Sequence, residues 1–467
     1  MDPTTLSIPE TLHFLSSLSY DISSFSHRAG IPRAERRFRG DPVVRKLLDA
    51  LVFFLHTHPN RGDRFAMTLT IVQNEIVATV AANTPGDIPH TDPSSPQVIL
   101  NTIWKHMAVY SGTAEKPTEN TQLITYILQT HLPLLRSRLS KWRRCYEAYR
   151  HEFVWVRRSN LLSAALTNYL DDIDAIFCAT MAFSESNETP SQESISQFAS
   201  HIRLCKNLSK QLAKLSDNDR KLLSTTQSAC GRGIGTTRYI NIIRFGEKLA
   251  TPLIQIDRVL YFCRTAKYQN FLTKPFRIRI VPQPLRIDMP TLPNNWTKAE
   301  AAAFIRQSYM TIDWPCADPE AVISAIDHLS GVAMENIGKS RISGPHCECL
   351  LVQHHHNEAQ GNPIMATYIG LSKPCCLQCG IFLDVYNEIV PNGPLFFIRG
   401  RDSHVYPCIV PSIDTAIDVS IADKTRTTLT ELICYVVHAY MKHVYDRSGV
   451  GLISGTMRQE FLLSYSY

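Results

Sequence analysis

Apolar residues recur at spacings of three and four through much of the first half of the chain, which is the period of an amphipathic helix. The stretches that show this pattern are residues 98–106, 122–131, 134–156, 160–183 and 195–215. The pieces between them, such as 82–89 and 184–191, are polar and rich in helix breakers, as loops are. The pattern predicts an all-helical domain over residues 1–265.

The pattern changes near Phe276. Residues 276–281 alternate apolar and basic side chains, Pro282-Gln283-Pro284 interrupts, and residues 285–289 alternate again. This predicts two strands joined by a tight connection. Residues 298–309 and 319–334 return to the helical period, and Asp318-Pro319 is a good start signal for the second of these helices.

The last third alternates between the two periods. Residues 347–358 and 376–389 predict helices, the apolar runs 364–371 and 395–399 predict strands, and 427–444 predicts a final amphipathic helix. Helix, strand, helix, strand is the order of a layered α/β sheet with parallel connections. We therefore expect a multidomain α+β/α/β protein with a helical domain at 1–265, an α/β domain at 266–425, and a C-terminal helix and tail at 426–467.

Composition narrows the class of protein. The chain has 467 residues, of which 44% are hydrophobic and 19% charged, with a net charge of +6. These are values of a globular protein of two or three domains, and they permit an anionic partner without demanding one. The chain has no signal-like N-terminus and no apolar run of membrane-spanning length, so we expect no membrane association. Its 13 cysteines show no disulfide-like spacing, which predicts a reduced, intracellular protein of the cytoplasm or nucleus.

Candidate chemistry lies in the predicted α/β region. His346-Cys347-Glu348 is followed, after a predicted helix and strand, by Cys376-Leu377-Gln378-Cys379. One imidazole and two thiolates can fill three corners of a tetrahedral Zn²⁺ site and leave the fourth for water. Cys376 and Cys379 share one side of a first helical turn, where the helix N-terminus favours thiolate. The sequence thus predicts Zn²⁺ on His346, Cys376 and Cys379.

Glu348 is predicted as the catalytic residue. A bound zinc ion lowers the pKa of its water to around 7, and a neighbouring carboxylate can accept that proton. Zinc nucleobase deaminases combine a His-x-Glu with a later Pro-Cys-x-x-Cys. In such a site the zinc-bound water attacks the amino-bearing ring carbon while Glu348 moves protons to the ring and to the leaving ammonia.

The chain here resembles the cytidine deaminase-like zinc superfamily, over roughly residues 276–412. The likeness lies in Gly344-Pro-His-Cys-Glu-Cys-Leu-Leu351, in Tyr368-Ile-Gly-Leu-Ser-Lys-Pro-Cys-Cys-Leu-Gln-Cys379 and in the later Arg399-Gly-Arg-Asp-Ser-His-Val-Tyr-Pro407. It looks most like a poorly characterised fungal branch related to deaminases predicted among bacterial toxins and effectors. The resemblance implies a three-layer α/β/α domain around a mixed sheet, with the ligands and proton shuttle named above.

Two departures from the family pattern concern cysteines. Cys347 stands where the family usually has a small residue, and a thiol is small enough for that place. In Pro374-Cys375-Cys376 the proline does not directly precede the predicted ligand, so Cys375 is an alternative ligand. The spacing favours Cys376.

Other residues give weaker signals. His404 and Tyr406 could stack on a substrate base, and Arg399 with Arg401 could hold a phosphate, although solvated loop residues explain the same letters. The histidines at 354–356 point in different directions from a helix and fit an exposed, polar helix end. The basic and aromatic segment 136–158 could follow nucleic acid, but an amphipathic helix that packs its aromatics inward is the favoured account.

The sequence therefore predicts a zinc-dependent hydrolytic deaminase acting on a nucleobase, in a nucleotide or in nucleic acid, with an oligomeric state left open. The alternative is a catalytically inactive, zinc-stabilised interaction module that binds its partner through the helical domain. An unliganded glutamate beside the metal favours the enzyme, because a structural zinc site has no need of one.

Overall fold

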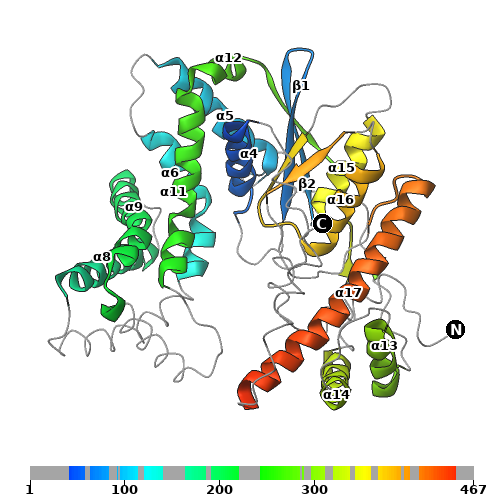
Figure 1. Cartoon of the computed structure of the whole chain (residues 1–467). Helices are drawn as coiled ribbons and strands as arrows, with labels where there is room; N and C mark the ends of the chain where they lie inside the picture. The colour runs from blue at the N-terminus through cyan, green and yellow to red at the C-terminus, as the bar shows by residue number, and fades with distance from the viewer. Residues whose placement is uncertain are drawn as a thin grey trace.

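The computed structural model describes residues 41–57, 64–83, 92, 95–113, 120–139, 163–185, 191–219, 242–283, 287–288, 296–310, 319–336, 342–358, 367–390, 394–399 and 410–448. Over these ranges the protein is mostly helical around a small mixed sheet, which is an α+β architecture (Figure 1).

The helices follow the apolar periodicity of the sequence. They are α4 (Pro42–Phe54), α5 (Pro96–Gly112), α6 (Thr121–Thr130), α8 (Ala164–Glu185), α9 (Gln192–Lys214), α11 (Ile242–Arg264), the short η1 (Ala266–Tyr268) and α12 (Gln269–Leu272), α13 (Lys298–Met310), α14 (Pro319–Asn336), α15 (Cys347–Glu358), α16 (Leu377–Ile389) and α17 (Thr415–Ser448). Of the predicted helix 134–156, the structure describes residues 134–139, and these are helical. Capping fixes several starts: the Asp41 side chain accepts a hydrogen bond from the Val43 amide at 2.9 Å, and Pro42 occupies the first helical position.

Within the described residues, five strands form the main sheet in the order β3-β2-β1-β6-β7. They are β1 (Phe65–Val72), β2 (Glu75–Ala82), β3 (Phe276–Ile280), β6 (Thr367–Leu371) and β7 (Phe396–Ile398). The β1–β2 and β1–β6 pairs are antiparallel, whereas β2–β3 and β6–β7 are parallel. The parallel β6–β7 pair confirms the connection predicted for the motif region.

The prediction of an all-helical first half is wrong, because β1 and β2 form a hairpin within it. Gln73 and Asn74 make the turn with φ of 48° and 68°, the left-handed conformation that two-residue hairpin turns require. The β-branched residues around that turn favour strands. The sheet thus draws strands from both sides of the expected boundary at residue 265, and α17 crosses the one expected at residue 425.

The two strands predicted after residue 276 exist but do not pair with one another. β3 joins the main sheet beside β2. β4 (Ile287–Asp288) pairs instead with β5 (Ile342–Ser343), just before the metal-site motif. The alternating sequence predicted the strands correctly, but the partners lie far away along the chain.

Helices cover both faces of the sheet, and the side chains alternate between two cores. Phe65 and Met67 belong to the core shared with α4, α5 and α11, while Ala66 between them belongs to the core shared with α13 to α17. Tyr368 and Ile369 on β6 divide in the same way. Figure 1 shows α4 and α5 on one side of β1 and β2, with α15 and α16 on the other. No helix in the described ranges is long and apolar enough to cross a membrane.

Gly370 of β6 packs closely against the backbone of α4. A Cβ placed there would lie 3.0 Å from the backbone carbonyl carbon and oxygen of Leu48. A side chain here would push the backbone of α4 away by a few tenths of an ångström, so glycine at this position lets α4 pack closely on the β1–β6 seam.

Two buried histidines must stay neutral in the folded protein. His131 lies in the first core, stacked on Phe53 with ring centroids 5.3 Å apart. Burial lowers its pKa to about 3. Burial also lowers the pKa of His355 on α15, to about 4. Both shifts run the same way, so protonation of either ring opposes folding.

We expect the free energy of unfolding to fall as the pH drops below the ordinary histidine pKa of 6.5. Stability is fully present above that pH, and is lost progressively as the pH falls towards the folded-state values. The loss is about 2 kcal/mol per histidine between about pH 7.5 and about pH 5. Denaturant unfolding across this range measures it. Protons also compete with metal at cysteine and histidine ligands, which adds a second pH dependence. The difference between wild type and His131→Leu isolates the contribution of His131 to the pH dependence of the free energy of unfolding. An unchanged slope in that variant would contradict the assignment.

Candidate metal centre

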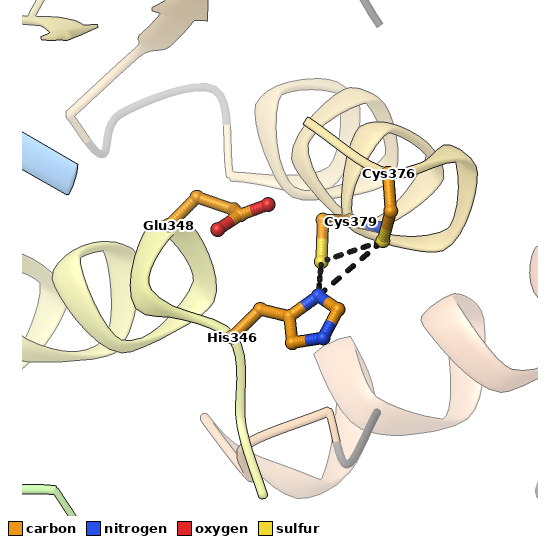
Figure 2. A group of neighbouring side chains, drawn as sticks. All are labelled: His346, Glu348, Cys376 and Cys379. Carbon is orange, nitrogen blue, oxygen red and sulfur yellow. Dashed lines mark hydrogen bonds between the residues drawn. The ribbon is translucent and has the colours of Figure 1, made fainter. Parts of the chain in front are cut away.

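Two helix starts meet on the sheet face covered by α15 and α16. His346 directly precedes α15, and Cys376 is the N-cap of α16, its sulfur accepting from the Cys379 amide at 3.5 Å. Their side chains converge with a carboxylate into one buried group whose ligand atoms all lie within 4.8 Å of one another (Figure 2). The members of the group are His346, Glu348, Cys376 and Cys379.

Three of these side chains form a close triangle. The Nδ1 atom of His346 lies 3.1 Å from Cys379 Sγ and 3.4 Å from Cys376 Sγ, and the two sulfurs are 3.3 Å apart. Tetrahedral zinc on the same atoms has edges of about 3.6 Å for nitrogen to sulfur and about 3.8 Å between sulfurs. Opening each edge by a few tenths of an ångström would therefore give these three atoms the spacing of zinc ligands. Nitrogen and two sulfurs are also the donor set that zinc prefers.

Glu348 belongs to the same group but stands apart from the triangle. It comes from the first turn of α15, and Figure 2 shows its carboxylate on the side of Cys379 that faces away from the Cys376 backbone. Glu348 is 3% exposed to solvent. A buried carboxylate beside one nitrogen and two sulfur donors could exchange protons with a group bound at the fourth position of a metal ion.

The hairpin from the first half of the chain supports the two helix starts. The Cys347 amide, an N–H that α15 itself cannot satisfy, donates to Asn83 Oδ1 at 2.6 Å. Ser372, between β6 and the cysteines, exchanges hydrogen bonds with Phe65, at 2.9 Å through its Oγ and 3.0 Å through its amide. The sequence does not identify Asn83 or Ser372 as part of the site. The one sequence feature that could have indicated them is that each directly follows a strand.

Burial and neighbouring charges act on His346 and on the three cysteines that lie beside the metal group without belonging to it. Burial by itself lowers the pKa of His346, but the hydrogen bond to Cys376 and the charges of Cys376 and Glu348 raise it overall. Metal binding must displace that proton, so affinity falls in acid. Burial raises the pKa of the thiols of Cys347, Cys349 and Cys375, which favours their neutral form.

Cys375 lies next to the metal group but is not one of its members. Its thiol donates to the Cys376 carbonyl at 3.3 Å. We expect Cys376→Ser to lose bound zinc and Cys375→Ser to keep it, because a hydroxyl replaces a thiolate ligand poorly but can still donate to a carbonyl. Metal analysis of the two purified variants makes the comparison, and zinc retained in Cys376→Ser but lost from Cys375→Ser would reverse the ligand choice.

The predicted substrate residues are placed only in part. Arg399 follows β7 and forms an ion pair with Asp49 of α4 at 3.4 Å. Tyr368 donates to the same carboxylate at 2.9 Å, and burial raises the pKa of Asp49. Arg399 therefore contacts the α4 side of the sheet, opposite α15 and α16, and its role towards a substrate stays a prediction. His404, Tyr406 and Arg401 lie outside the described residues, as does the basic and aromatic segment beyond residue 139.

The histidine triplet is not an exposed helix end as predicted. His355 is buried and its Nε2 lies 2.8 Å from Thr68 Oγ1 on β1. His356 Nδ1 lies 2.9 Å from the Tyr386 hydroxyl on α16, and His354 lies 3.4 Å from Glu358. The contacts of His355 and His356 attach α15 to the sheet and to α16, whereas the pair of His354 with Glu358 lies within α15 itself. The sequence could not show them because Thr68 is far away along the chain.

Comparison with known proteins points to the same segment. Residues 345–411 match the model of the family described as OTT_1508_deam-like deaminase. No curated protein and no solved structure matches the chain. The matched segment contains all four residues of the metal group, so the part of the chain that resembles a deaminase is also the part that could bind zinc.

Proposed function

We propose that the protein is a zinc-dependent hydrolytic deaminase that acts on a nucleobase. The observation that carries the proposal is the buried carboxylate of Glu348 within 4.8 Å of the three nitrogen and sulfur donors, inside a segment that matches a deaminase family. His346, Cys376 and Cys379 would hold the ion. Two thiolates would balance the charge of Zn²⁺, so the site tolerates an anionic nucleophile.

Zinc, when bound, supplies Lewis-acid activation of water near neutral pH. Glu348 then accepts the proton of the attacking water. It delivers this proton to the ring nitrogen next to the reacting carbon. It then takes the second proton from the hydroxyl newly added to that carbon and gives it to the departing amino group, which leaves as ammonia while the hydroxyl oxygen becomes the carbonyl oxygen of the product. The net reaction replaces an amino group with an oxygen, as in cytosine or adenine deamination. A carboxylate in a buried site can serve each of these transfers without moving far.

The proposal covers nucleobases in nucleotides and in nucleic acid. A mildly basic chain, with a net charge of +6, is compatible with either anionic substrate. The narrower kinship with a fungal branch, and with bacterial toxin and effector deaminases, also stays a prediction, as does placement in the cytoplasm or nucleus. So does the three-layer form of the deaminase domain, for which the helices on both faces of the sheet are the support.

A zinc-stabilised interaction module is the second candidate. The observation that favours it is the burial of the whole group, with His346 the most exposed member at 9%. Closed, buried zinc sites are typical of structural metals, which can supply much of a domain's folding energy. Glu348 distinguishes the two, since a structural site has no use for it.

The test is ammonia release by the full-length, zinc-loaded protein. Cytidine, adenosine, their nucleotides, single-stranded DNA and single-stranded RNA are the substrates, and chelator-treated protein is the control. Zinc-dependent release from at least one of them supports the enzyme. Stoichiometric zinc with no release from any of them, combined with a large loss of stability on chelation, would favour the structural module.

A further inference from the structure

We propose that a polar row at one end of the main sheet binds the sugar phosphate of the substrate. The row consists of Arg64, Asn83 and Gln283, which lie beside the ends of β1, β2 and β3. Arg64 would hold the phosphate, and Gln283 would hold a sugar hydroxyl. The inference rests on the proposed function and deepens it, because it makes the substrate a nucleotide or a nucleic acid and not a free nucleoside.

Three neighbouring strands bring the row together. β1 and β2 are antiparallel and β2 and β3 are parallel, so the start of β1 and the ends of β2 and β3 lie at one end of the sheet. The Asn83 amide donates to the Arg64 carbonyl at 3.0 Å, and Gln283 Nε2 donates to the Asn83 carbonyl at 2.6 Å. None of the three residues lies in the segment 345–411 that matches the deaminase family.

The row faces the metal centre, because side chains alternate between the two faces of a strand. Ala66 on β1 belongs to the core shared with α13 to α17, and Arg64 lies two positions before it. Ala81 on β2 belongs to the same core, and Asn83 lies two positions after it. Asn83 Oδ1 accepts from the Cys347 amide at 2.6 Å, which places this end of the sheet beside the start of α15.

Arg64 supplies positive charge next to the metal group. Burial and the Glu348 carboxylate raise the pKa of the Cys347 thiol, and the charge of Arg64 opposes that rise. Arg64 is half-buried, whereas all four residues of the metal group are buried. A guanidinium is always charged, and its fork of N–H donors matches the oxygens of a phosphate. A nucleotide that presents its base to the metal keeps its phosphate at a distance from it, and Arg64 offers a cation at such a place.

Gln283 offers the complementary group. Its Oε1 atom is buried and has no hydrogen-bond partner among the described residues, while its Nε2 atom is bonded to Asn83. A buried acceptor without a donor costs free energy, so a bound molecule that donates to it is stabilised there. A sugar phosphate presents both an anionic acceptor for Arg64 and a hydroxyl donor for Gln283. A nucleoside presents only the hydroxyl.

Removal of the guanidinium should abolish the preference for phosphate. In Arg64→Gln, kcat/KM for phosphorylated substrates should fall about 10- to 100-fold, the scale of a charged hydrogen bond, whereas kcat/KM for nucleosides should change little. Arg64→Lys keeps the charge without the fork, so it should fall between wild type and Arg64→Gln. Gln283→Leu should weaken nucleotides and nucleosides alike, because both carry the sugar.

The experiment measures kcat/KM of full-length, zinc-loaded protein for cytidine, adenosine, their monophosphates and single-stranded RNA. A loss on monophosphates and RNA in Arg64→Gln assigns the phosphate to a single nucleotide, and a loss on RNA alone assigns it to the nucleic-acid backbone; both support the inference. Equal losses on nucleosides and phosphorylated substrates would reduce Arg64 to a support of α15 and overturn the inference. Unchanged values for every substrate would overturn it too, and wild-type values in Gln283→Leu would remove Gln283 from the site.

A binding measurement separates this inference from the proposed function. Zinc-loaded Glu348→Gln lacks the proposed proton shuttle, so calorimetry with the same nucleosides, monophosphates and RNA gives dissociation constants without turnover. Tighter binding of the phosphorylated ligands that disappears in Arg64→Gln/Glu348→Gln supports the inference even if no substrate is deaminated. Ammonia release by wild type, combined with equal affinities for nucleosides and phosphorylated ligands, would keep the proposed function and overturn the inference.

Discussion

Glu348→Gln is expected to lower the kcat of zinc-dependent ammonia release by about 10²- to 10⁴-fold and to leave the zinc content unchanged. The amide has nearly the shape of the carboxylate but cannot accept the proton of the attacking water, and general acid–base groups contribute on that scale. None of the three ligand atoms of His346, Cys376 and Cys379 is altered. Initial rates of ammonia release and metal analysis on the same preparation measure both effects.

Glu358 on the same helix provides the matched control. It lies at the C-terminal end of α15, its side chain is 44% exposed, and it pairs with Arg279. An exposed ion pair of this kind contributes little, so Glu358→Gln should keep wild-type activity. Equal rates for wild type and Glu348→Gln on every substrate would eliminate the proton-shuttle role and, with it, the deaminase proposal.

Cys379→Ser is expected to have the second large effect, loss of bound zinc and of all stabilisation by zinc. Cys379 Sγ touches both of the other donors, His346 Nδ1 at 3.1 Å and Cys376 Sγ at 3.3 Å, so its loss opens the triangle. In wild type, a metal that binds only the folded state adds about 4 kcal/mol when its free concentration is a thousand times Kd. Thermal unfolding with added zinc and with chelator should differ for wild type and coincide for the variant.

Cys434 on α17 tests whether any buried cysteine would behave in this way. It is fully buried, and its thiol donates to the Ser308 carbonyl at 3.1 Å, a hydrogen bond that a serine hydroxyl can keep. Cys434→Ser should retain zinc and its stabilising effect. Full zinc occupancy in Cys379→Ser would instead show that the ligand set has been assigned wrongly.

The gathering of the four side chains of the metal group could be predicted from the sequence because its information is local. His346 and Glu348 sit at the start of a helix that begins at Cys347, as the periodicity predicted, and Cys376 and Cys379 share one first turn. Spacing within a single turn fixes which side chains lie together. The parallel β6–β7 pair followed from the same local order of helix and strand.

The sequence predicted the surroundings of that group poorly because their partners are remote. The β1–β2 hairpin was missed since Gln73-Asn74 lacks the glycine that usually marks such turns, and its neighbours in the sheet are β3 and β6. The sequence predicts an exposed His355 because only the folded sheet brings Thr68 to it. Periodicity identifies an apolar face but does not say what covers it.

The pairing of β1 with β6 also implies a delay between the synthesis of the two strands in the cell. Met67 pairs with Gly370, so a ribosome adds roughly 300 residues between them, which takes on the order of 15 to 60 seconds. Until β6 emerges, the edge of β1 that receives it carries unpaired amide and carbonyl groups, which other chains can pair with. The four residues of the metal group all lie on the late side of this seam. The hairpin whose Asn83 binds the start of α15 is therefore synthesised long before the residues that it supports.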